Sequence, residues 1–169
     1  MRRLEGEGLV YRIPDKGVFV KEINYEDILE ITEIRTLFEL HALQSCIDNV
    51  SDSELKELEQ QLIHLPDDRI DDEENFYIVD RSTHKLIMSY CRNSRMLNYL
   101  KTLEAQMEKV RRVSATTPQR LPKSKAEHLE IVHAIKNRDF ARASEALQLH
   151  LLNVRNSALN ALRDSKFHS

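Results

Sequence analysis

From residue 24 onward, apolar side chains recur every three or four positions, which is the spacing of one face of an α-helix. In the first of these segments the apolar stripe consists of Ile28, Ile31, Phe38, Ala42 and Cys46. Asn24 can cap this segment, and Glu26 and Asp27 follow where the helix dipole favours acidic side chains. The pattern therefore predicts a helix that begins at Asn24.

The same periodicity continues in segments that are separated by short polar breaks. A serine cap at Ser51 or Ser53 precedes a leucine stripe in the second segment. Residues 114–125 are polar, contain two prolines and are predicted to be the one clear loop, whereas residues 137–139 are predicted to form a turn. The later helices are predicted over residues 51–65, from 71 to about 92, 96–113, 126–137 and 140–165.

The amino-terminal segment, residues 1–23, follows a different pattern. Two short β-branched and aromatic runs, LVYRI and VFVKEI, flank a turn from Pro14 to Gly17, which predicts a two-stranded hairpin. The preceding MRRLEGEG is typical of the end of a helix that glycine stops. The sequence therefore predicts a short appendage over residues 1–23 and a main helical domain over residues 24–169.

Composition agrees with a mainly helical chain and excludes several classes of protein. The sequence has no Trp, three Gly and four Pro, whereas an all-β chain needs more turn residues. Its net charge of −3 excludes general electrostatic attraction to nucleic acids, so any DNA contact has to be local. Cys46 and Cys91 have no partner motif and are predicted to be buried free thiols. Without an apolar span, the chain is predicted to be a cytoplasmic all-α antiparallel bundle of about six or seven helices.

Four residues form a candidate metal site. Asp80 and His84 are four positions apart, so both lie on one helical face. His128 precedes Arg138 in the predicted turn by nearly as many positions as separate Arg138 from His150. At a rise of about 1.5 Å per residue, these two histidines reach similar heights in an antiparallel helix pair. If the two segments face each other, three histidines and one carboxylate converge.

The neighbours of these histidines predict that they point into the core. Apolar residues share their faces, namely Ile131, Ile135, Ala143, Ala146 and Leu147. A single histidine among apolar neighbours is more often a hydrogen-bonded core residue than a ligand, but four convergent candidates favour a metal site. The remaining histidines are interpreted as surface or packing residues, namely His41, His64, His133 and His168.

Three imidazoles and one carboxylate suit Zn, Ni, Mn or Fe better than Ca or Mg, which prefer oxygen ligands. One or two open coordination positions would remain for water or for the carboxylate of a small ligand. A metal-dependent enzyme is one alternative, although no HExxH motif or second carboxylate at motif spacing supplies a general base. A purely structural metal site in a dimerisation module is another.

Arg35 interrupts the apolar stripe of the first long helix near its centre. A buried guanidinium needs an anionic partner, which is either an acidic residue of a neighbouring helix or a bound carboxylate. The sequence leaves both interpretations open. Arg111 and Asn153 are also candidates for ligand contacts, but both are predicted to lie on the surface.

Several of these segments together resemble the GntR family of transcription regulators, specifically the FadR subfamily. RRLEGEGLVYRIPDKGVFV resembles the end of its winged helix-turn-helix domain. The rest resembles the FCD ligand-binding domain, in EIRTLFELHAL with Arg35, VDRSTHKLI with Asp80 and His84, and EHLEIVHAIKNRDFARASEALQLH with Asp139 and Ala143. The resemblance covers essentially the whole chain.

This resemblance implies an all-helical, non-enzymatic domain that binds a divalent transition metal ion, with Zn, Ni or Mn favoured, through residues matching Asp80, His84, His128 and His150. It also implies a small carboxylate effector held beside the metal with help from Arg35, and a homodimer whose two DNA-binding heads respond to that effector. Only the last part of a winged helix domain is recognisable. Operator contacts by wing residues such as Lys16 and Gly17 are therefore expected only in a complete protein.

Overall fold

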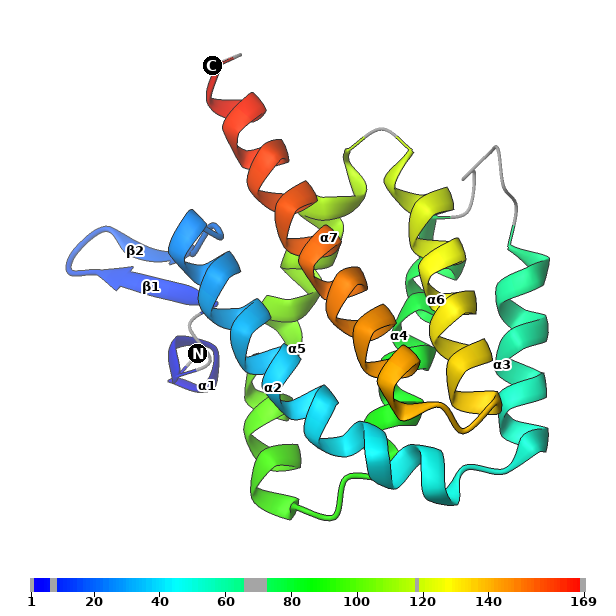
Figure 1. The fold of residues 1–169 in the computed structure, drawn as a ribbon. Helices are drawn as coiled ribbons and strands as arrows, with labels where there is room; N and C mark the ends of the chain where they lie inside the picture. Colours follow the sequence, from blue (N-terminus) through cyan, green and yellow to red (C-terminus); the bar gives the residue numbers. More distant parts are fainter. Residues whose placement is uncertain (1, 7–8, 66–72, 118, 168–169) are drawn as a thin grey trace.

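The computed structural model describes residues 2–6, 9–65, 73–117 and 119–167, which form helices and one short hairpin (Figure 1). The elements in chain order are α1 (Arg2–Gly6), β1 (Val10–Ile13), β2 (Gly17–Val20), α2 (Tyr25–Asn49), α3 (Asp52–His64), α4 (Glu73–Ser89), α5 (Ser94–Ala115), α6 (Arg120–Lys136) and α7 (Phe140–Phe167). The predicted all-α bundle with an amino-terminal hairpin is confirmed.

The predicted starts of the first two long helices are confirmed by their hydrogen bonds. The Asn24 side chain accepts a bond from the backbone N–H of Asp27, while the Asp27 carboxylate accepts one from the Asn24 N–H. Ser51 and Glu54 form the same reciprocal capping box at the start of α3. These side chains satisfy backbone donors that have no partner within the first turn of a helix.

Helix α7 runs through the bundle and packs against α2, α5 and α6, while α3 lies on the far side of α6 (Figure 1). A large apolar cluster fills one part of the bundle, and its fully buried members include Leu43, Leu55, Leu62, Ile87, Ile131, Ile135, Leu147 and Leu151. A smaller apolar cluster fills another part and contains Ile28, Ile31, Val110, Val154 and Ala158. Along α2, the buried polar residues Arg35 and Glu39 separate the two clusters.

The segment between α5 and α6 differs from its predicted form. Residues 114–125 were expected to be a loop, but α5 continues to Ala115 and α6 already begins at Arg120. Pro122 is the third residue of α6, where the backbone N–H would have no helical partner, so proline does not interrupt the helix there. Helix α4 also ends at Ser89, before the predicted end near residue 92.

The predicted hairpin is present, with β1 and β2 antiparallel and Ile13 opposite Gly17. Its turn closes with a hydrogen bond from the Lys16 N–H to the Ile13 carbonyl. Both Asp15 and Gly17 have positive φ, at 60° and 106°, so Asp15 as well as the glycine adopts the left-handed conformation. The Lys109 ammonium of α5 donates to the carbonyl of Lys21, which ties the chain after the hairpin to the bundle.

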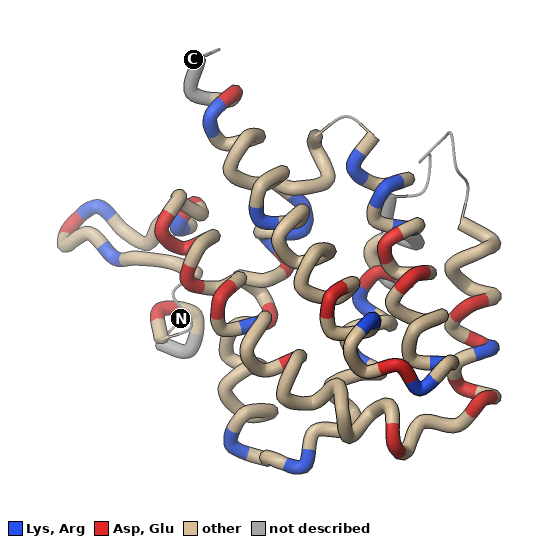
Figure 2. The backbone as a smooth tube through the Cα atoms, in the orientation of Figure 1, with Lys and Arg blue, Asp and Glu red and all other residues tan. Residues whose placement is uncertain are grey.

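Charged positions of both signs are interspersed along the described helices (Figure 2), consistent with the small net charge of −3. None of the described helices is long and apolar enough to cross a membrane. Cys46 and Cys91 are both buried and unpaired, as predicted. Burial raises the pKa of the Cys46 thiol to about 12, so this residue is a packing group and not a reactive thiolate.

Candidate metal centre

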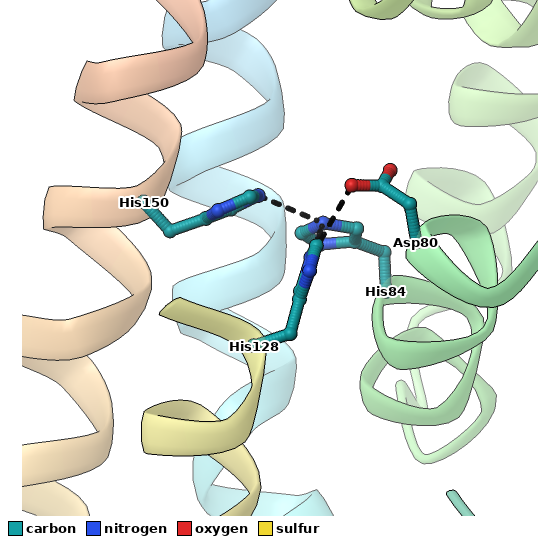
Figure 3. A group of neighbouring side chains, drawn as sticks. All are labelled: Asp80, His84, His128 and His150. Atoms are coloured by element: carbon teal, nitrogen blue, oxygen red, sulfur yellow. Dashed lines mark hydrogen bonds and ion pairs between the residues drawn. The ribbon is translucent and has the colours of Figure 1, made fainter. Parts of the chain in front are cut away.

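The four predicted ligands meet in the interior of the bundle (Figure 3). Asp80 and His84 come from α4, His128 from α6 and His150 from α7. One ligand atom of each residue lies within 4.8 Å of the ligand atoms of the others, and all four side chains are buried. The i, i+4 spacing on α4 and the matching heights on α6 and α7 therefore produce the predicted convergence.

The histidine Nε2 atoms face one another at the spacing of ligands on a single ion. His84 Nε2 lies 3.2 Å from His150 Nε2 and 3.2 Å from His128 Nε2. Two nitrogens bound at about 2.0–2.1 Å to one zinc ion are roughly 3.3–3.4 Å apart in tetrahedral geometry and about 2.9 Å apart at a right angle. The observed distances fall between these values, so the three rings fit a shared ion.

Two carboxylates hold the outer nitrogens of these rings. Glu39 Oε2 lies 2.6 Å from His84 Nδ1, and Glu127 Oε2 lies 2.8 Å from His150 Nδ1. A carboxylate accepts, so each Nδ1 carries a proton and each neutral ring presents an Nε2 lone pair to the centre. Two lone pairs in such close contact repel unless a cation lies between them. This outer pairing is the usual support for histidine ligands of a metal.

His128 is oriented by a hydroxyl instead of a carboxylate. Ser124, one turn earlier on α6, has its Oγ 3.5 Å from His128 Nδ1 and donates to Asp80 Oδ1 at 3.2 Å. Asp80 Oδ1 in turn lies 3.5 Å from His128 Nε2. Ser124 thus connects the carboxylate of α4 with the imidazole of α6.

Burial controls the protonation of the three histidines. It lowers the pKa of His84 and of His150 well below the usual value, with nearby positive groups adding to the effect, and it also lowers the pKa of His128. The rings are therefore neutral at pH 7, as metal ligands must be. Burial acts to raise the pKa of Asp80, but His128, His84 and Arg111 outweigh it and hold this pKa well below its usual range.

Arg35 is buried and has an acidic partner on its own helix, one turn away. Its Nε donates to Glu39 Oε1 at 2.6 Å, and its side chain is only 5% exposed. The sequence predicted a partner on a neighbouring helix or a bound ligand, whereas the acidic partner found lies on α2 itself. Arg35 Nη2 is buried and has no hydrogen-bond partner among the described residues. One side of the guanidinium therefore still needs an acceptor.

Arg111 is also buried, so its predicted surface position is wrong. Its guanidinium contacts Asp80 Oδ2 at 3.4 Å and Glu108 Oε2 at 2.9 Å, which offsets the cost of burial. Asn153 is half-buried and donates to Glu127 Oε1 at 2.8 Å. Both residues belong to the surroundings of the histidines and not to a solvated face.

A cavity of about 260 Å³ opens beside this centre, between α2, α4 and α5. His84 and Arg35 line it together with Arg111, and its apolar wall includes Met88 and Leu100. The cavity therefore gives a small molecule access to the side of the centre where Arg35 lies.

Sequence reasoning missed the residues that support the four candidates, namely Glu39, Ser124 and Glu127. A weak signal existed, because Glu39 and Ser124 each lie four positions from Arg35 and His128 on the same helix. The other histidines agree with their predicted roles, since His133 pairs at the surface with Glu59, and His41 and His64 are exposed. His168 lies outside the described residues.

A protein-family model described as the FCD domain matches residues 30–153. The HTH-type transcriptional repressor RspR of Escherichia coli K12 is 24% identical over 162 residues, which are 92% of this chain and 68% of that protein. The uncharacterized HTH-type transcriptional regulator YdhC of Bacillus subtilis is 26% identical over 154 residues, covering 90% of this chain and 67% of that protein.

Solved structures share the fold. The metal-free FCD domain of TM0439 matches with a TM-score of 0.75 at 24% identity, over 85% of this chain and 99% of that one. The Zn²⁺-bound form of the same domain matches with a TM-score of 0.72 at 24% identity, over 84% and 98%. A GntR family regulator from Pseudomonas syringae matches with a TM-score of 0.64 at 20% identity, over 96% and 69%. With the family model covering most of its length, this chain belongs to the FCD domain family.

Proposed function

We propose that this chain is the metal-dependent, effector-sensing part of a GntR-type transcription regulator. The observation that carries the proposal is the buried convergence of Asp80, His84, His128 and His150 beside a cavity that Arg35 lines. Relatives named as HTH-type transcriptional regulators, and a family member solved with Zn²⁺, support the same function. The domain is a sensor and not an enzyme.

Asp80, His84, His128 and His150 would hold a divalent transition metal ion, with Zn, Ni or Mn as candidates. Neutral imidazoles and a carboxylate are the donors that these ions prefer. The bound ion supplies a Lewis-acidic position that attracts an anionic ligand. Glu39 and Glu127 fix the tautomers of His84 and His150, so that their Nε2 atoms are available without rearrangement.

A small organic acid would be the effector, with Arg35 as its anchor in the protein. The unpaired Nη2 of Arg35 offers a charge-assisted hydrogen bond to a carboxylate in the cavity. An effector changes DNA affinity only if it binds two arrangements of the regulator unequally. We propose that this happens in a homodimer, in which the metal domains set the spacing of the DNA-binding heads.

Residues 1–23 would correspond to the end of the winged helix-turn-helix domain, and residues 24–169 to the sensing domain. The helix, hairpin and turn before Asn24 support this division, because the hairpin has the form of a wing. In a complete regulator Lys16 and Gly17 at the hairpin turn would lie near operator DNA.

The proposal is tested by measuring metal content together with the thermal shift produced by organic acids. The wild-type protein should contain about one divalent ion per chain, and a binding acid should raise its apparent Tm through mass action. His84→Ala should lose both the ion and the acid response. His133→Ala is the matched control, because this surface histidine on α6 lies outside the centre and should leave both unchanged.

Other results would contradict the proposal. Unchanged metal content in His84→Ala would remove the metal site. Retained metal with no response to any acid would favour a structural ion, and turnover of an acid would favour a metal-dependent enzyme.

A further inference from the structure

The cavity beside the metal centre has an uneven charge along its wall. Five cationic side chains line it, namely Arg35, Arg81, Lys85, Lys101 and Arg111. Two carboxylates, Glu39 and Glu104, face them. A ligand in this cavity is therefore expected to carry negative charge. The positions of the cations indicate how many anionic groups the ligand has and where they bind.

At the inner end, one of two buried guanidiniums has an unused donor. Arg35 Nη2 has no hydrogen-bond partner among the described residues, and its side chain is 5% exposed. Arg111 also lines the cavity, with its Nε already 3.4 Å from Asp80 Oδ2. Both guanidiniums are buried and line the same cavity. An anionic group of a ligand in this cavity would satisfy the open donor of Arg35. One anionic group of the ligand fits this position, next to His84.

At the outer end, two lysines mark a second cationic position. Lys85 follows His84 on α4, Lys101 lies across the opening on α5, and both are exposed. No ion pair with another described residue involves either lysine. Glu104 is the carboxylate at this end, so the lysines outnumber it. Arg81, one turn before Lys85 on the same face of α4, adds a buried Nε without a hydrogen-bond partner among the described residues.

The ion pairs around the cavity do not neutralise the excess of cationic side chains. Arg111 contacts Asp80, and Arg81 shares Glu108 with Arg111, so these two carboxylates join the two that line the cavity. Five cations then face four anions, and a divalent metal ion adds two more positive charges. The arginines are matched by Glu39, Asp80 and Glu108, whereas the two lysines lie at the exposed end of the cavity. A second negative charge on the ligand would gain a charge-assisted contact at that end, which a ligand with one charge would not make.

From these observations we propose that the effector is a short dianion, with one anionic group at Arg35 and Arg111 and the second at Lys85 and Lys101. The space between the two ends is bounded by Met88, Leu97 and Leu100, which suit a short apolar linker. The volume of about 260 Å³ lies near the lower end of small-molecule sites, about 300 Å³, so the linker is only a few carbons long. This inference rests on the proposed function and specifies the ligand class for the same site.

Calorimetric titration of the zinc-loaded full chain tests the inference, with succinate and butyrate as probes because their carbon chains have equal length. Succinate should bind about tenfold or more tightly than butyrate, the difference expected from one additional charge-assisted contact. Metal content is measured after each titration, so that removal of zinc by succinate is not mistaken for binding.

The double variant Lys85→Gln with Lys101→Gln should lose the preference for succinate and keep its affinity for butyrate. The matched control is Lys56→Gln with Lys123→Gln, which removes the same charge from exposed positions outside the cavity and should retain the preference.

Equal binding of succinate and butyrate by the wild-type protein would overturn the dianion and leave acid sensing intact. A preference for succinate that survives in the cavity variant would overturn the assignment of the second position to the lysines. Failure of both acids, and of the longer pair glutarate and pentanoate, would overturn the acid-sensing function and this inference together.

Discussion

The large apolar cluster and the metal centre are equally buried parts of the same bundle, yet they differ in what they need from outside the chain. Leu62 and Ile131 in the apolar cluster are fully enclosed by other apolar side chains and need no further partner. In the metal centre, His84 and His150 turn unprotonated nitrogens toward each other, and Arg35 keeps an unused donor. The first region is stabilised by packing alone, whereas the second is completed only by ions.

The largest effect should come from the apolar cluster. Leu62→Ala removes a fully buried side chain from α3 and should lower the free energy of unfolding by about 2–5 kcal/mol through lost burial and the remaining cavity. Urea denaturation with excess zinc and with EDTA measures the loss. The same loss in both conditions is expected, and a loss confined to the zinc sample would show that the two regions are not separate.

The stability that the metal centre contributes should, by contrast, depend on zinc. Zinc at a free concentration about 100 times its Kd should stabilise the wild-type protein by about 2.7 kcal/mol through mass action. His150→Ala removes one candidate ligand and should abolish this zinc-dependent increment. Denaturation curves that still shift with zinc in this variant would place His150 outside the ion's ligands.

A smaller effect should follow from the outer carboxylates. Glu39→Gln keeps the shape of the side chain but weakens the acceptor for His84 Nδ1, so zinc affinity should fall about 10- to 100-fold. Competition with a chelator of known affinity measures the change. Glu59→Gln is the matched control, because Glu59 contacts His133 at the surface and should not alter zinc binding. An unchanged affinity in Glu39→Gln would limit this carboxylate to its pairing with Arg35.

The smallest effect is expected at the exposed cap of α3, away from the metal centre. Ser51→Ala removes the cap of α3 and should cost about 1 kcal/mol. Thermal or urea unfolding should give the same value with zinc and with EDTA. A zinc-dependent difference would mean that the start of α3 responds to the metal centre.

Much of the fold follows from local pattern, because helices depend on three- and four-residue periodicity and on caps. Asn24 is identifiable as a cap from residue type, whereas residue type left Ser51 and Ser53 as alternatives and the structure shows Ser51. Pro122 misleads, since proline in a first helical turn leaves no sequence mark that distinguishes it from proline in a loop. The position of Pro122 depends on how α6 packs, which short-range pattern does not encode.

The four candidate ligands are also accessible from sequence, because spacing along a helix and height across a helix pair are geometric quantities. The charged residues that surround these ligands cannot be identified from spacing in this way. Arg111 and Glu127 have the residue types of a solvated helix face, and their burial follows from tertiary neighbours such as Asp80 and His150. Charged residues are identified as interior only when their partners are known.

Glu39 has a consequence for communication within the domain. One of its oxygens accepts from Arg35 and the other faces His84, so a single carboxylate joins the proposed effector anchor to a candidate metal ligand. An anion that draws Arg35 away from Glu39 leaves more negative charge on the Glu39 oxygen at His84. The His84 imidazole then becomes a stronger electron-pair donor to the metal ion. Thermodynamic reciprocity then requires the ion to raise affinity for the anion by the same factor. If the chain acts as the proposed sensor, metal and acid would bind cooperatively, and the full response would require both together.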